Sequence, residues 1–75
     1  MNIAEILNKL KWDKRYDFEK VKIYYVSRGA EGDVAIITGK EIKELGKMFI
    51  ETASSYIPYH RIIKIEYEGK IIFTR

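Results

Sequence analysis

One short segment of the sequence combines a residue type that binds anions with one that can donate or accept a proton. The segment IPYHRI, residues 57–62, contains the only proline and the only histidine of the chain, and Arg61 follows the histidine directly. Arginine makes bidentate contacts to phosphate, and histidine can donate or accept a proton near neutral pH. The segment is therefore a candidate anion site. A packed loop histidine beside an arginine paired to a glutamate explains the same residues equally well.

The backbone of this segment decides whether the two side chains can act together. On a β-strand, alternation would place His60 and Arg61 on opposite faces. Pro58 cannot donate to a central ladder, so it is expected at a strand entrance or on an edge strand. If Pro58 makes the segment a turn instead, alternation does not apply and His60 and Arg61 can converge.

A second candidate is the segment RGAEGD, residues 28–33. Its two glycines suit a hairpin turn that requires positive φ, and Asp33 is suited to capping it. The functional alternative is that Arg28 projects from the base of the loop and that backbone N–H groups form an anion-binding nest. A Walker-type phosphate loop is excluded, because no Gly-Lys-Ser/Thr run is present.

Other chemistry is largely excluded by residue type. The chain has no cysteine, which rules out disulfides, cysteine-ligated zinc and thiol catalysis. One histidine and three aspartates give no metal-ligand spacing. Ser54 or Ser55 with His60 matches no known triad pattern. We therefore expect no metal, no cofactor and no assigned catalytic residue.

Composition indicates a single small globular domain spanning residues 1–75. The chain is 47% hydrophobic and 33% charged, and its net charge of +3 permits a nucleic-acid partner without requiring one. It lacks an apolar run of about 18 residues, so no membrane span is expected. An amphipathic start that contains Glu5 makes a poor signal peptide, which favours the cytoplasm. The absence of glutamine and the abundance of Lys and Glu follow a hyperthermophile trend.

Residues 2–11 are predicted to form a helix. Its apolar residues recur at the spacing of one helical face, and Asn2 with Glu5 forms a capping-box pattern. Trp12 is expected to pack where the helix ends. The apolar positions are Ile3, Ile6, Leu7 and Leu10.

Short strands separated by turn signals follow the helix after a connector at residues 13–19. The strand at 20–27 is apolar on both faces, which is typical of a central strand. Residues 39–46 fit either a short helical turn or an irregular strand, and 53–56 read as a loop. The predicted fold is α+β, with an N-terminal helix packed on a small curved antiparallel β-sheet. Its other strands are expected at 34–38, 47–52 and 61–67, with a terminal hairpin closed by 71–75.

Aromatic residues could serve the core or a nucleic acid. Rings in a sheet usually belong to the core, but exposed rings beside basic residues can stack on bases. We expect Trp12 and Tyr25 in the core and Tyr59 as the ring best placed for exposure.

The whole chain resembles a small archaeal family of uncharacterised proteins that has been proposed to recognise RNA ends bearing a cyclic group. IPYHRI is the most specific part of the resemblance. Two positions depart from the family pattern: ASSY replaces an acidic, glycine-containing loop, and Phe73 replaces a tryptophan. The other matching residues are Trp12, Tyr24 or Tyr25, Arg28-Gly29-Ala30, Gly32-Asp33, Gly39, Glu41-Ile42 and Phe49.

The resemblance implies a non-catalytic RNA-binding module for 2′,3′-cyclic phosphate or other phosphorylated ends. By position, Arg28 and Arg61 would contact phosphate oxygens, His60 the phosphate or ribose, and Tyr59 the terminal base. In larger members the domain is joined to RNA-ligase-like or two-histidine phosphoesterase domains, which suggests partners in RNA processing. Two alternatives stay open: a phosphodiesterase that uses His60 as general acid or base, and a protein-interaction module of an RNA-processing complex.

Overall fold

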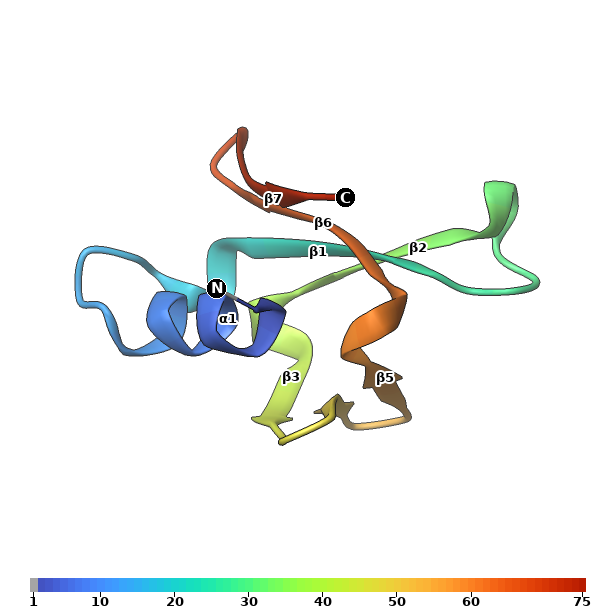
Figure 1. The fold of residues 1–75 in the computed structure, drawn as a ribbon, viewed down its shortest axis with the longest axis horizontal. Helices are drawn as coiled ribbons and strands as arrows, with labels where there is room; N and C mark the ends of the chain where they lie inside the picture. Colours follow the sequence, from blue (N-terminus) through green and yellow to red (C-terminus); the bar gives the residue numbers. More distant parts are fainter. Residues whose placement is uncertain (1) are drawn as a thin grey trace.

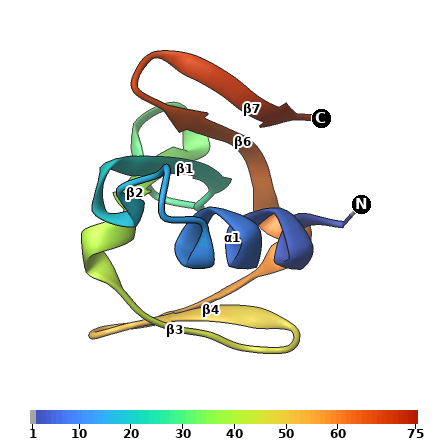
Figure 2. The same cartoon turned by 90° about the vertical axis from the view of Figure 1, so that its left-hand side faces the viewer.

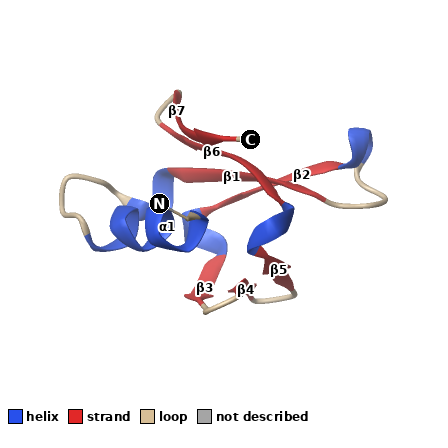
Figure 3. Ribbon diagram, in the orientation of Figure 1, coloured by secondary structure: helices blue, strands red, loops and turns tan. Residues whose placement is uncertain are grey.

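A helix and two small sheets make up the protein in this computed structural model, which describes residues 2–75 apart from the side chain of Glu31 (Figure 1). Short 3₁₀ turns join several of the strands (Figure 3). The helix and strands described are α1 (Ile3–Trp12), β1 (Val21–Val26), β2 (Val34–Thr38), β3 (Ile42–Leu45), β4 (Phe49–Thr52), β5 (Tyr56–Pro58), β6 (Ile62–Tyr67) and β7 (Lys70–Thr74). The 3₁₀ turns are Phe18–Lys20, Glu31–Asp33, Gly39–Glu41 and Tyr59–Arg61.

The strands form two antiparallel sheets, one of order β2-β1-β6-β7 and one of order β3-β4-β5. Helix α1 lies between them (Figure 2). The α+β class predicted from the sequence is confirmed, but the single expected sheet is divided in two. The division falls at two 3₁₀ turns, Gly39–Glu41 between β2 and β3, and Tyr59–Arg61 between β5 and β6, where the chain passes from one sheet to the other.

Helix α1 follows the predicted pattern closely. The Asn2 side chain accepts a hydrogen bond from the Glu5 backbone N–H at 2.9 Å, and its amide donates to the Glu5 carboxylate at 3.0 Å. Leu7 is fully buried, Ile3 and Leu10 are buried, and Ile6 packs against the core from its edge. The predicted helix and its apolar face are therefore confirmed.

The prediction that Trp12 packs at the end of the helix is wrong, because its side chain is 74% exposed. It lies four residues after the exposed Asn8, which is one helical turn further along the solvent face. The position of Trp12 on the helix, rather than its apolar character, decides its environment.

Strand β1 is the central strand that the sequence predicted, paired with β2 on one side and β6 on the other. Ile23 faces Ile37 across one pair and Ile65 across the other, and Ile65 faces Phe73 of β7. These side chains form a continuous apolar row on the inner face of the sheet. Tyr25, expected in the core, is half-buried against it.

The ambiguous segment 39–46 contains both of its predicted alternatives in succession, a 3₁₀ turn at Gly39–Glu41 and then strand β3. Gly39 is buried against the chain at Phe18, whose carbonyl oxygen would lie 1.8 Å from a Cβ at position 39. Only glycine fits this approach. The predicted loop at 53–56 is shorter than expected, because Tyr56 already belongs to β5.

Leu7→Ala should lower the free energy of unfolding by roughly 2–5 kcal/mol, because it removes a fully buried side chain from a thin core. Chemical denaturation measures the loss. The matched control is Lys9→Ala on the exposed face of α1, which should change stability by less than about 0.5 kcal/mol. Equal effects of the two substitutions would contradict the assignment of Leu7 to the core.

Candidate functional site

The segment 57–62 is a turn between two strands. Pro58, with φ −61° and ψ 141°, is the last residue of β5, and Tyr59–Arg61 form a 3₁₀ turn before β6 begins at Ile62. Pro58 thus lies on an edge strand, as expected, but at the end of that strand rather than at the entrance of the next. Because the segment turns, strand alternation does not separate His60 from Arg61, and both side chains are exposed.

Buried residues on both sides fix the turn. Ile57 and Ile62 are buried in the core, at 3% and 0% exposure. The Tyr59 backbone N–H donates to the Met48 carbonyl at 3.2 Å, and the Tyr59 hydroxyl donates to the Gly46 carbonyl at 2.6 Å. The two isoleucines of IPYHRI therefore hold its ends in the core while its polar tips face solvent.

The environment of Tyr59 differs from the expected exposed ring. Tyr59 is half-buried against the core, and burial raises the pKa of its hydroxyl. Trp12 and Tyr56, at 74% and 62% exposure, are far more accessible. The hydrogen bond to Gly46 and the contact with the core hold the Tyr59 ring in place, so only part of it is open to a ligand.

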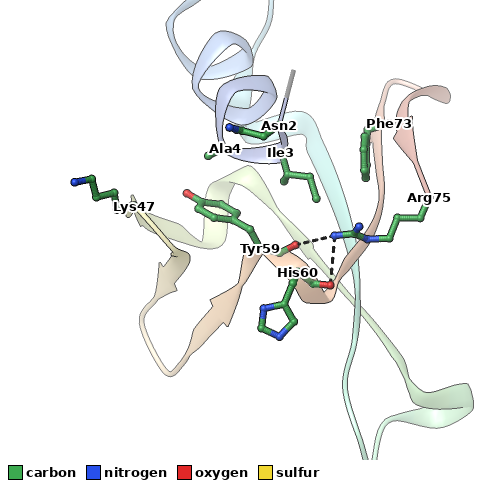
Figure 4. A pocket seen from close by; sticks show the side chains of 8 residues that line it. All are labelled: Asn2, Ile3, Ala4, Lys47, Tyr59, His60, Phe73 and Arg75. Atoms are coloured by element: carbon green, nitrogen blue, oxygen red, sulfur yellow. Dashed lines mark hydrogen bonds between the residues drawn. The ribbon is translucent and has the colours of Figure 1, made fainter.

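Arg75, which the sequence analysis did not select, binds the same turn from the end of β7 (Figure 4). Its Nε donates to the Ile62 carbonyl at 2.7 Å, and its terminal NH2 donates to the carbonyls of His60 at 3.3 Å and Tyr59 at 3.4 Å. The guanidinium thereby satisfies three backbone acceptors around the turn. No spacing pattern signals this contact, because the partners lie 13 to 16 residues apart.

The predicted polar residues Arg28, His60 and Arg61 line one hollow of about 470 Å³, together with Val26. We call it the basic hollow. Arg28 follows the end of β1, whereas His60 and Arg61 come from the turn before β6. Among the side chains that the structure describes, neither arginine forms an ion pair, so the glutamate partner considered for Arg61 is not found there. Two guanidinium groups and an imidazole therefore converge from two distant parts of the chain.

The loop that carries Arg28 is a turn closed by its backbone. The Ser27 N–H donates to the Asp33 carbonyl, and the Asp33 N–H donates to the Ala30 carbonyl, each at 2.9 Å. Gly29 and Gly32 have φ of 94° and 68°, as the turn interpretation requires, and Asp33 itself has φ 58°. Asp33 thus closes the turn through its backbone. The anion-binding nest stays a prediction.

A second hollow, of about 410 Å³, also borders the turn, and Figure 4 shows the side chains that line it. We call it the aromatic hollow, because Tyr59 and Phe73 form part of its wall. His60 belongs to both hollows, so they meet at this residue. The residues that line the aromatic hollow are Asn2, Ile3, Ala4, Lys47, Tyr59, His60, Phe73 and Arg75.

A separate polar cluster on the outer face of β1 and β6 is satisfied internally. The Tyr24 hydroxyl donates to the Glu66 carboxylate at 2.5 Å, and Lys64 lies 3.6 Å from the same carboxylate. The hydrogen bond from Tyr24 lowers the pKa of Glu66 and raises the pKa of Tyr24. The Glu66 carboxylate is therefore already paired with Tyr24 and Lys64, and Glu66 lines neither hollow.

The described side chains of residues 2–75 include no cluster of three or more His, Asp or Glu residues that could hold a metal ion. In the same range, no helix is both long and apolar enough to cross a membrane.

Comparison with known proteins finds relatives along the whole chain. A family model described as the MJ1316 RNA cyclic group end recognition domain matches residues 1–75. UPF0248 proteins of Archaeoglobus fulgidus and Thermococcus onnurineus are 37% and 40% identical over 70 and 73 residues, covering 92% and 96% of this chain and 99% and 83% of theirs. That of Pyrobaculum aerophilum is 37% identical over 78 residues, 97% of each chain. No solved structure matches significantly.

Arg75→Ala should lower the free energy of unfolding by about 1.5–3 kcal/mol, because it removes charge-assisted hydrogen bonds to three carbonyls. Thermal or chemical unfolding measures the change. Lys70→Ala, an exposed cation on the same strand, is the control and should be nearly neutral. A loss no greater than that of the control would show that Arg75 does not stabilise the turn.

Proposed function

Because the chain belongs to the family of the MJ1316 RNA cyclic group end recognition domain, we propose that it binds RNA ends that carry a phosphate, above all a 2′,3′-cyclic phosphate. The basic hollow is the binding site. The observation that supports this most is the convergence of Arg28, His60 and Arg61 on that hollow from segments about thirty residues apart.

Each residue of the basic hollow has a distinct role in this proposal. The guanidinium groups of Arg28 and Arg61 bind phosphate oxygens, where planar N–H pairs fit two oxygens at once. His60 hydrogen-bonds the phosphate or the adjacent ribose. Because no described carboxylate pairs with either arginine, a phosphate does not have to displace an existing partner.

Binding explains this site better than catalysis. Hydrolysis of a cyclic phosphodiester needs one group to take a proton from water and another to give a proton to the leaving oxygen. The basic hollow is lined by one imidazole, two guanidinium groups and a valine, and a guanidinium does not exchange its protons near neutral pH. A phosphodiesterase that relies on His60 would therefore lack its second proton-transfer group at this hollow.

The protein-interaction alternative draws on a surface that adjoins the basic hollow at Val26. The outer face of the β2-β1-β6-β7 sheet exposes several aliphatic side chains, which is the kind of surface that a protein partner can cover. These are Val26, Val34, Ile36 and Ile71. That surface and the basic hollow can coexist, and the same module could act beside an RNA-ligase-like or phosphoesterase protein.

Arg28→Ala and Arg61→Ala should each weaken binding of a short RNA with a 2′,3′-cyclic phosphate end by roughly ten- to a hundredfold, because each removes a charge-assisted contact. Arg61→Lys should restore binding only in part, because lysine lacks the planar fork. The log–log salt dependence should become shallower by about 0.7 for each arginine removed. Isothermal titration calorimetry measures the affinities.

The control for these variants is Arg15→Ala, since Arg15 lies outside both hollows and pairs with Asp13. It should bind as the unchanged protein does, and all four variants should keep their thermal stability. Matched RNAs with cyclic-phosphate, linear-phosphate and hydroxyl ends should bind in decreasing order of affinity, with the hydroxyl end weakest. Equal affinity for all three ends would reject the proposed function and indicate general RNA binding.

His60→Ala should weaken binding of the cyclic-phosphate RNA by about tenfold, because it removes one hydrogen bond to the phosphate or the ribose. Affinity for the hydroxyl-ended RNA should change less, since that end lacks the phosphate. Calorimetric titration of both RNAs measures the two effects. Unchanged affinity of folded His60→Ala for the cyclic-phosphate end would remove His60 from the site.

A further inference from the structure

The aromatic hollow lies immediately beside the basic hollow, with His60 common to both. Its size, about 410 Å³, falls within the range of ordinary small-ligand sites. Figure 4 shows the rings of Tyr59 and Phe73 on either side of Ile3, with the Arg75 guanidinium next to them. The proposed phosphate contacts use none of Tyr59, Phe73 or Arg75, and only for Tyr59 did the resemblance imply a ligand, the terminal base.

The walls of the aromatic hollow combine the rings of Tyr59 and Phe73 with several polar side chains. Phe73 is half-buried and packs against the core, so its ring is held in position. Tyr59 is held by its hydrogen bond to Gly46. Rings fixed in this way can receive a planar ligand at little cost in side-chain entropy.

The Arg75 guanidinium is also held in position, in this case by hydrogen bonds. Its Nε and one terminal nitrogen already donate to the carbonyls of Tyr59, His60 and Ile62, so part of the guanidinium edge is occupied. The guanidinium carbon lies 5.9 Å from the centre of the Phe73 ring. The guanidinium lies over that ring and lines the hollow together with it, and nucleobases stack on guanidinium planes as well as on aromatic rings.

We propose that the aromatic hollow receives the base of the terminal nucleotide whose phosphate occupies the basic hollow. The inference rests on the proposed function and extends it from an anion site to a site for a whole 3′-terminal nucleotide. The phosphate is assigned to the basic hollow because its two arginines form no described ion pair, and the base to the aromatic hollow because the Tyr59 and Phe73 rings line it. The ribose lies against His60, between phosphate and base.

Stacking makes this site tolerant of base identity. Every base has a π-face, so stacking contributes to affinity without reading sequence. We therefore expect the four terminal nucleotides to bind within about tenfold of one another, with purines above pyrimidines because their stacking area is larger.

The direct test compares two RNA pentamers that both end in a 2′,3′-cyclic phosphate, one complete and one whose terminal ribose has no base. The protein should bind the complete RNA about ten- to a hundredfold more tightly, which is the usual effect of one stacked base. Equal affinity for the two RNAs, with end discrimination and the arginine effects intact, would overturn the base subsite and leave the proposed function standing. Failure to discriminate the three kinds of end would instead reject the proposed function.

A pair of variants locates the base. Phe73→Leu keeps an apolar side chain in the core but removes the flat ring, and it should reduce the preference for the complete RNA to less than about threefold. Tyr56→Leu is the matched control, an exposed ring outside both hollows, and it should keep the full preference. Thermal unfolding confirms that both variants are folded. A full preference in folded Phe73→Leu would place the base elsewhere.

Discussion

A single small core shared by one helix and two sheets is the constraint on which the rest of this structure depends. Among the described residues ten aliphatic side chains are buried in it, and α1 lies between the two sheets that supply most of them. Since both sheets use the same core, the chain must cross between them within a few residues. The turn Tyr59–Arg61 is one of these crossings, and burial of Ile57 and Ile62 on either side directs its His60 and Arg61 outward. The exposure of these two side chains thus results from the way the chain joins two sheets around one core.

Much of this architecture follows from local patterns in the sequence. The apolar face of α1 repeats at helical spacing, and β1, which has apolar residues on both faces, is paired on both sides as expected. Both signals come from neighbouring residues, so they can be detected without knowledge of the fold. Residue type alone does not predict burial, as Trp12 shows. Its aromatic ring suggested a core position, but its place on the helix puts it on the solvent face. The division into two sheets was not predicted either, because the pattern of apolar residues along a strand does not indicate which strands pair.

The candidate site was accessible to sequence reasoning only in part. His60 and Arg61 stand out through their residue types beside a proline, and Arg28 through its place at the start of a turn. Their convergence depends on the 3₁₀ turn, whose alternative was a strand that would have separated them. Phe73 and Arg75 were not predicted to line a site, because both reach the aromatic hollow through the pairing of β7 with β6. A contact between residues distant in sequence leaves no local pattern.

The bond from Arg75 to the turn links the motions of two regions that are separate in the sequence. Arg75 follows β7, and β7 pairs only with β6 in its sheet. The hydrogen bonds from Arg75 to the Ile62 and His60 carbonyls therefore tie the last strand to the turn. Regions held by common contacts open as one cooperative unit, with a free energy below that of global unfolding. Fraying of β7 should therefore loosen the walls of both hollows together. Conversely, a ligand that binds near His60 would slow amide hydrogen exchange along the outer edge of the sheet, at residues it never touches.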